Sequence, residues 1–239
     1  MVLQGKPGLR GGQDRRSLPT YTIPEAARYL GIPERTAEYW FSRENKILQP
    51  SAYFGHTALL SFRDLSEAYV LALLTKFYGF PMRTLQRIVE SAKKETRLQR
   101  PLIEADLKVL FRNLILEKPA RGGRPRQMID LAHGGALVFP EFVDQLGRRI
   151  LKDRQHAPSK LYPWRLVKAN DDSRPVSIDP EVVSGRLVVT GTRIPVTILL
   201  AKRMKGRSEE ELACSYEIST DAVRKALLHI DRTIYPKAA

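Results

Sequence analysis

The sequence has little cysteine and no long apolar run, and both scarcities narrow the classes of protein to which it can belong. Its single thiol, Cys214, cannot form an internal disulfide framework, which favours a reducing compartment. The longest apolar run, residues 69–74, is far too short to cross a bilayer. Residues 1–20 lack the apolar core of a secretory signal. We therefore expect a cytoplasmic protein that does not contact a membrane.

Sequence motifs of common enzymes are also missing. The chain contains no nucleotide-binding GxxxxGKS, GxxxxGKT or GxGxxG, no HExxH, no GxSxG and no CxxC. A zinc site would need clustered ligands, and the four histidines are isolated at positions 56, 133, 156 and 229. We predict no catalytic activity, no cofactor and no metal. A nucleic-acid-processing enzyme whose site is assembled from residues distant in sequence stays an alternative.

Positive charge is what the chain has in excess. Forty Lys and Arg residues stand against 26 Asp and Glu, which gives a net charge of +14. This balance favours an anionic partner, of which nucleic acid is the commonest. The excess is spread almost evenly along the sequence, so the charge alone does not locate the binding site.

Two short helical patterns stand near the N-terminus, separated by a Gly-Ile-Pro corner. A capping box of Thr22 and Glu25 predicts the start of the first helix, and Gly31 predicts its end. Pro33 suits the first turn of the second helix. Together they form a helix-turn-helix pattern. The apolar face of the second helix holds Ala37, Trp40 and Phe41.

After the second helix the spacing of the apolar residues changes from that of a helix to that of β-strands. Residues 46–48 and 58–62 predict a short hairpin with its turn near Gly55, which beside a helix-turn-helix is a wing. Two longer helices are expected over 64–77 and 82–96, followed by short strands within 109–139 and a helix over 140–153. The C-terminal part predicts a small β-hairpin and three helices, over 195–204, 209–216 and 220–229.

These patterns indicate an α+β fold that is mostly helical. We expect a flexible basic arm over 1–19, a winged helix-turn-helix DNA-binding domain over 20–98, a middle α/β region over 99–153, a linker over 154–175, and a C-terminal helix-turn-helix-like module of three helices with a short β-hairpin over 176–235.

A repeat relates the two ends of the chain. Residues 208–227 align with residues 22–41 without a gap. The alignment matches the capping box, a small residue in the first helix and an isoleucine in the turn. The two copies differ in charge, since 22–46 is neutral and 208–232 carries a net charge of −3. Because phosphate contacts dominate affinity for DNA, we assign DNA reading to the first copy and a protein–protein role to the second.

The candidate DNA-binding residues lie on the second helix, just after it and in the wing. Trp40 continues the apolar face and is expected in the core rather than against a base. A helix-turn-helix corner that never touches nucleic acid is the alternative for this pattern. The residues predicted to contact DNA are Arg35, Thr36, Tyr39, Arg43, Lys46 and His56.

Two segments resemble known families. The stretch LLSFRDLSEAYVLALL, with the helices and wing before it, is similar to the winged N-terminal part of MerR-like regulators. The C-terminal segment from 177 to 228 resembles a small domain of unknown function found in VapB-type antitoxins. Its signature is Ser184-Gly185 and then Gly191, Thr192, Arg193, Ile194 and Pro195, which we expect to scaffold the module and its dimer. The alternative role for Arg193 is to tie the hairpin to the neighbouring helix.

The resemblance implies the antitoxin of a type II toxin–antitoxin system. Such a homodimer would bind and block a PIN-domain (VapC-type) ribonuclease toxin and repress its own operon by binding the operator DNA. The resemblance does not identify the toxin-binding residues, which would lie on folded surface or in the middle region. A stand-alone MerR-like transcriptional regulator that senses a small effector stays the alternative.

Overall fold

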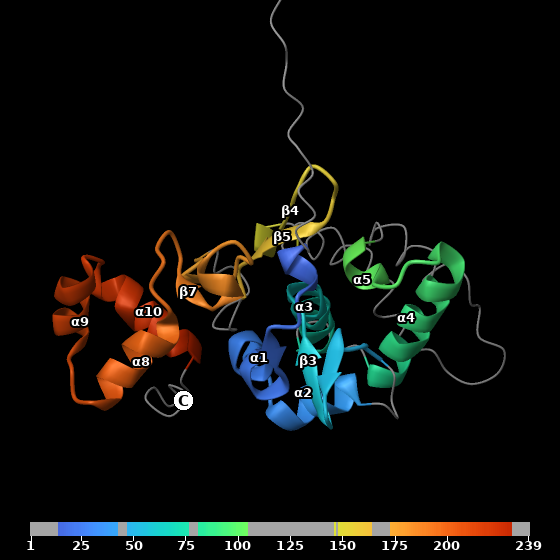
Figure 1. Ribbon diagram of the computed structural model, residues 1–239, viewed down its shortest axis with the longest axis horizontal. Coiled ribbons are helices and arrows are strands. Elements are labelled where there is room, and N and C mark those ends of the chain that lie inside the picture. The colour runs from blue at the N-terminus through green and yellow to red at the C-terminus, as the bar shows by residue number, and fades with distance from the viewer. Residues whose placement is uncertain are drawn as a thin grey trace, which may run out of the picture.

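The computed structural model describes residues 14–42, 47–76, 81–104, 146, 148–163 and 173–230. These residues combine helices with small antiparallel sheets, which confirms the predicted α+β class (Figure 1). The strands predicted within 109–139 lie outside the described residues, as do the arm up to residue 13 and the end of the chain after residue 230. Among the helices that are described, none is long and apolar enough to span a membrane.

The N-terminal part packs helices around a three-stranded antiparallel sheet with the strand order β1-β3-β2. Its elements are η1 (Arg15–Ser17), β1 (Tyr21–Thr22), α1 (Ile23–Leu30), α2 (Glu34–Phe41), β2 (Ala52–Phe54), β3 (Thr57–Leu60), α3 (Phe62–Lys76), α4 (Met82–Thr96) and α5 (Pro101–Glu104).

The first two helices begin and end where the sequence predicts. The hydroxyl of Thr22 accepts a hydrogen bond from the amide of Glu25 at the start of α1, and Gly31 ends this helix in the left-handed conformation. The predicted capping box is only half formed. The Glu25 carboxylate accepts a hydrogen bond from the Tyr29 hydroxyl (2.7 Å) instead of closing the box.

The predicted hairpin is present, but its first strand was placed wrongly. Ile47 and Leu48 are buried outside any strand, because the amide of Leu48 donates to the carbonyl of Trp40 at the end of α2 (3.0 Å). The strands β2 and β3 instead pair around a turn at Gly55, which has a φ of +61°. A third strand, β1, was not predicted; it pairs with β3 through Tyr21 and Thr22.

Helix α3 lies at the centre of the N-terminal part (Figure 1) and contacts α1, α5, η1, β3 and β5. Every residue from Asp64 to Leu74 is buried, which explains why the run of apolar residues at 69–74 is not confined to one face of the helix. At its first turn the buried carboxylate of Asp64 accepts hydrogen bonds from the amides of Ser51 (2.9 Å) and Ser61 (2.8 Å). It also forms an ion pair with Arg100, so one carboxylate joins the hairpin, α3 and the start of α5.

The C-terminal part carries two small sheets and a group of three helices. Its elements are β4 (Ile150–Lys152), β5 (Pro158–Leu161), β6 (Val176–Ser177), η2 (Val183–Gly185), β7 (Val188–Val189), α8 (Val196–Met204), α9 (Glu209–Tyr216) and α10 (Thr220–Ile230). The three helices match the predicted ones to within one residue at each end.

Two predictions for the middle of the chain were wrong. The helix expected up to Asp153 gives way to β4, and the expected linker contains β5, which pairs with β4. The physical reason is the turn at Asp153, whose carboxylate accepts hydrogen bonds from the amides of Gln155 (2.8 Å) and Ala157 (3.0 Å). The polar composition that suggested a linker therefore belongs to a hairpin. Leu161 also pairs with Ile178, which ties this hairpin to the C-terminal part.

The Gly-Thr-Arg-Ile-Pro segment forms the turn before α8. Gly191 has a φ of +80°, which explains the glycine. The Thr192 hydroxyl donates to the carbonyl of Val189 (2.9 Å) and accepts from the amide of Ile194 (3.0 Å). Pro195 occupies the N-cap of α8. The segment therefore forms a hydrogen-bonded turn that leads into α8, while its role as a scaffold of the module and its dimer stays a prediction.

The second strand predicted in this segment did not form as expected. Strand β7 pairs with β6, and beyond a single bridge between Val188 and Pro195 the segment 192–194 is not a strand. The Thr192 hydroxyl is hydrogen-bonded to the carbonyl of Val189 and the amide of Ile194, and a longer pair of strands would need these backbone groups for its own hydrogen bonds. The side chain of Arg193 is exposed, and no hydrogen bond or ion pair joins it to another described residue.

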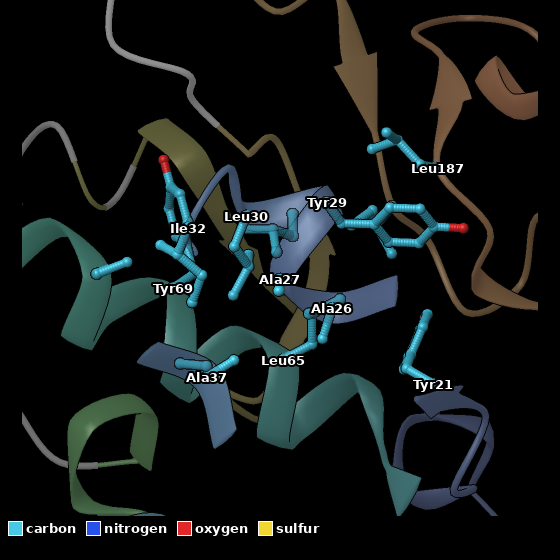
Figure 2. Close-up of a cluster of buried hydrophobic side chains, with 14 of the residues drawn as sticks. Tyr21, Ala26, Ala27, Tyr29, Leu30, Ile32, Ala37, Leu65, Tyr69 and Leu187 are labelled. Atoms are coloured by element: carbon cyan, nitrogen blue, oxygen red, sulfur yellow. The ribbon is translucent and has the colours of Figure 1, made fainter. Parts of the chain in front are cut away.

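The N-terminal and C-terminal parts meet at a buried joint beside α1. The Tyr21 hydroxyl donates a hydrogen bond to the carbonyl of Gly185 (2.8 Å), and the rings of Tyr21 and Tyr29 meet edge to face at 6.2 Å. Figure 2 shows Tyr29 extending from α1 toward Leu187 of the C-terminal part. From α10, the buried ring of His229 binds the carbonyl of Tyr29 (2.8 Å). The two parts therefore share one core.

His229 provides a donor that α1 itself cannot supply. The last carbonyls of a helix have no partner within the helix, and Tyr29 is the penultimate residue of α1. Because a carbonyl only accepts, the Nε2 atom of His229 must carry the proton.

We expect His229→Ala to lower the free energy of unfolding by roughly 1–3 kcal/mol, because it leaves a buried carbonyl unpaired and removes a packed ring. Denaturant unfolding followed by circular dichroism measures the change. The matched control is Leu228→Ala, at an exposed neighbouring position of α10. Equal, small effects of the two substitutions would show that the joint contributes nothing to stability.

A second buried group is Glu67 on α3, whose Oε1 atom accepts no hydrogen bond from the residues that the structure describes. Burial raises the pKa of this carboxyl to about 8. The positive charges of Lys93 and Arg100 lower the pKa, and the negative charges of Asp64 and Glu104 raise it further. The folded protein therefore holds a proton at pH values at which the unfolded chain has lost it. Since the folded pKa lies above the unfolded value, the free energy of unfolding falls as the pH rises from about 4.5 to about 8.

We expect Glu67→Gln to reduce this loss of stability, by on the order of a few kcal/mol at most. The measurement is denaturant unfolding at pH 5 and pH 8.5 for the wild type, the variant and the control Glu90→Gln, which alters an exposed carboxylate on α4. The wild type and the control should lose more stability with rising pH than Glu67→Gln. An identical pH dependence in all three proteins would contradict the account.

Candidate functional site

Helix α2 separates its buried residues from an outward face. Ala37, Trp40 and Phe41 are buried, as predicted. Arg35 and Tyr39, which are four residues apart and so share one face, are exposed, and Thr36 is half-buried next to them. The three residues of α2 that were predicted to contact DNA therefore lie outside the core.

A groove of about 500 Å³ runs between α2, the start of α1 and the β2–β3 hairpin. Its apolar lining comes from both helices and the hairpin. Its polar lining consists largely of Glu34, Glu38 and His56. The predicted residue His56 is thus placed across the groove from α2. The apolar residues in the lining include Ile23, Phe41, Tyr53 and Ala58.

Two carboxylates line the groove, which was not predicted from the sequence. Glu34 and Glu38 are four residues apart, so the spacing alone places them on one face beside that of Arg35. Because two carboxylates repel a phosphate, the groove itself is a poor place for a DNA backbone. A nucleic acid would approach over the Arg35–Tyr39 face. The predicted contacts Arg43 and Lys46 lie outside the described residues.

The helix pair α9–α10 repeats the local geometry of α1–α2. Each first helix has eight residues and ends at a residue in the left-handed conformation, Gly31 in α1 and Glu217 in α9. The amides of Ile32 and Ile218 then each donate to the carbonyl five residues back, at 3.0 and 3.1 Å. The repeat found in the sequence is therefore also a repeat of backbone structure.

The surfaces of the two pairs differ. Three glutamates occupy the first turn of α9, where the helix dipole favours negative charge. Glu211 completes a full capping box with Ser208, and Glu209 forms an ion pair with Arg224 of α10 (2.9 Å). The exposed part of this pair is acidic, which suits a protein partner better than DNA.

The described residues contain no cluster of three or more His, Cys, Asp or Glu side chains that would hold a metal ion. Cys214 is exposed on α9.

Comparison with known proteins relates this architecture to an antitoxin. Residues 176–229 match a family described as "Protein of unknown function (DUF433)". The chain is 26% identical to the "Putative antitoxin VapB45" of Mycobacterium tuberculosis, over 89% of this chain and 94% of that protein. The crystal structure of Rv2018 from Mycobacterium tuberculosis has the same fold, with a TM-score of 0.66 and 22% identity over 88% of this chain and 98% of that one.

We expect Trp40→Phe to lower the free energy of unfolding by only about 1–2 kcal/mol, because it removes part of a buried ring but no hydrogen bond to the indole Nε1 from any residue that the structure describes. Trp40→Ala should cost roughly 3–5 kcal/mol through the cavity that it leaves. Denaturant unfolding of the three proteins measures both effects. Equal losses for the two variants would contradict this account, because Phe retains much more of the buried volume than Ala does.

Proposed function

We propose that this protein is the antitoxin of a type II toxin–antitoxin system. The observation that carries the proposal is the similarity to an antitoxin over nearly the whole length of both chains. In this role the protein binds and neutralises a PIN-domain, VapC-type ribonuclease toxin and represses its own operon by binding the operator. It acts in the cytoplasm as a homodimer, without catalytic activity of its own.

The DNA-reading surface in this proposal is α2 with the neighbouring hairpin, used as a winged helix-turn-helix of the MerR-like kind. Arg35 and Tyr39 are exposed on one face of α2, and a guanidinium and a phenol suit contacts to base edges and phosphates. The net charge of +14 supports attraction to DNA at longer range.

The toxin-binding role is assigned to the C-terminal part. Its α9–α10 pair resembles the DNA-reading pair in backbone geometry but is acidic. A basic surface on the toxin would complement it.

The partner is tested by purifying the tagged full-length protein from its native cells and identifying the bound proteins by mass spectrometry. We expect a small PIN-domain ribonuclease in stoichiometric amount, whose activity falls when this protein is added. Recovery of specific DNA without such a ribonuclease would favour the alternative function, a stand-alone MerR-like regulator. Recovery of neither would contradict both.

The DNA-reading face is tested by a double substitution. We expect Arg35→Ala with Tyr39→Ala to abolish specific binding to the DNA upstream of the operon, measured by fluorescence anisotropy, because both base-edge candidates are lost. Circular dichroism and denaturant unfolding should stay close to the wild type, since both side chains are exposed. The control Arg186→Ala removes the same charge from an exposed site in the C-terminal part. Unchanged affinity in a folded double variant would exclude this face of α2 from DNA reading.

A further inference from the structure

The tip of the β2–β3 hairpin carries an unusually exposed aromatic side chain. Phe54 is 80% exposed, more than any other large hydrophobic residue that the structure describes. It forms the last pair of the hairpin with Thr57, and the turn that follows consists of Gly55 and His56. A phenylalanine at this place gains almost nothing from burial in the free protein.

The register of the hairpin separates Phe54 from the groove. Residues that face each other across an antiparallel pair point to the same side, and successive residues alternate. Tyr53 and its partner Ala58 line the groove against α2, as does Thr57. Phe54 alternates with Tyr53 along the strand, is not part of this lining and is exposed, so it does not contribute to packing against the helices.

The electrostatic setting of the tip suits a polyanion. The hairpin from Ser51 to Leu60 contains no acidic residue. The two carboxylates of this surface, Glu34 and Glu38, lie on the groove side. In Figure 1 the hairpin runs toward the same edge of the molecule as α2, and the two elements border one groove, so one extended partner can reach both.

We propose that Phe54 is a wedge that enters the minor groove of DNA, unstacks one base step and bends the duplex beside the site read by α2. This inference rests on the DNA binding proposed above and adds a residue that acts through the shape of the DNA. Apolar side chains inserted between base steps kink the duplex toward the major groove. The sequence at the kinked step then contributes to specificity, because pyrimidine–purine steps unstack most easily.

The test uses the full-length protein and duplexes that it enriches from a random pool. Bending is measured by energy transfer between dyes at the two ends of the duplex, and unstacking by the fluorescence of 2-aminopurine placed at the candidate step. Phe54→Ala should abolish the bend and the 2-aminopurine signal and weaken binding about tenfold, whereas Phe54→Leu should retain most of both. The control is Met204→Ala, which removes a side chain of similar exposure (75%) from the end of α8 and should change nothing.

The possible failures are distinguishable. If the wild type enriches no sequence, the proposed DNA binding and the wedge are both overturned. If Phe54→Ala binds and bends the enriched DNA like the wild type, only the wedge is overturned. If Phe54→Ala alters the mass of the free protein in solution but not the bend, Phe54 contacts a second copy of the chain, which also overturns the wedge.

Discussion

The hydrogen bond from the buried Tyr21 hydroxyl to the carbonyl of Gly185 connects residues 164 positions apart and holds the two parts of the chain together. It needs a glycine at the acceptor, since a Cβ atom at Gly185 would lie 2.1 Å from the Tyr21 oxygen. His229 adds a second link through the last turn of α1. Tyr21 also starts the sheet that carries the hairpin, so one residue positions the α1–α2 pair, the hairpin and the C-terminal part relative to one another.

This joint places two helix pairs of equivalent backbone geometry in one core with unlike surfaces. The α1–α2 pair exposes Arg35 and Tyr39 beside a hairpin that contains no acid, whereas the α9–α10 pair begins with three glutamates. The proposed division into a DNA-reading pair and a protein-binding pair follows from charge rather than from fold. Because α10 binds α1 directly, a partner seated on α10 would act on the helix that supports α2.

Local signals made much of the fold predictable. Thr22, Gly31, Ser208 and the apolar spacing mark helix ends that the structure confirms, because caps and turns depend on neighbouring residues. Strand β1 was missed because its two residues become a strand only through the distant β3. Strands β4 and β5 were missed because the polar residues of their turn suggested a linker. In the site, the exposure of Arg35 followed from helical spacing, and so would that of Glu34 and Glu38. The contact between Tyr21 and Gly185 could not be predicted, because no local sequence pattern indicates which residues so far apart in the chain come together.

The division of labour between the two pairs is tested most directly by hydrogen–deuterium exchange of the full-length protein, free and bound to duplexes that it enriches from a random pool. Binding should slow exchange of the amides in α2 and in the hairpin from Ser51 to Leu60 and leave those of α9 and α10 unchanged. Slower exchange in α9 and α10, with α2 and the hairpin unaffected, would contradict the account.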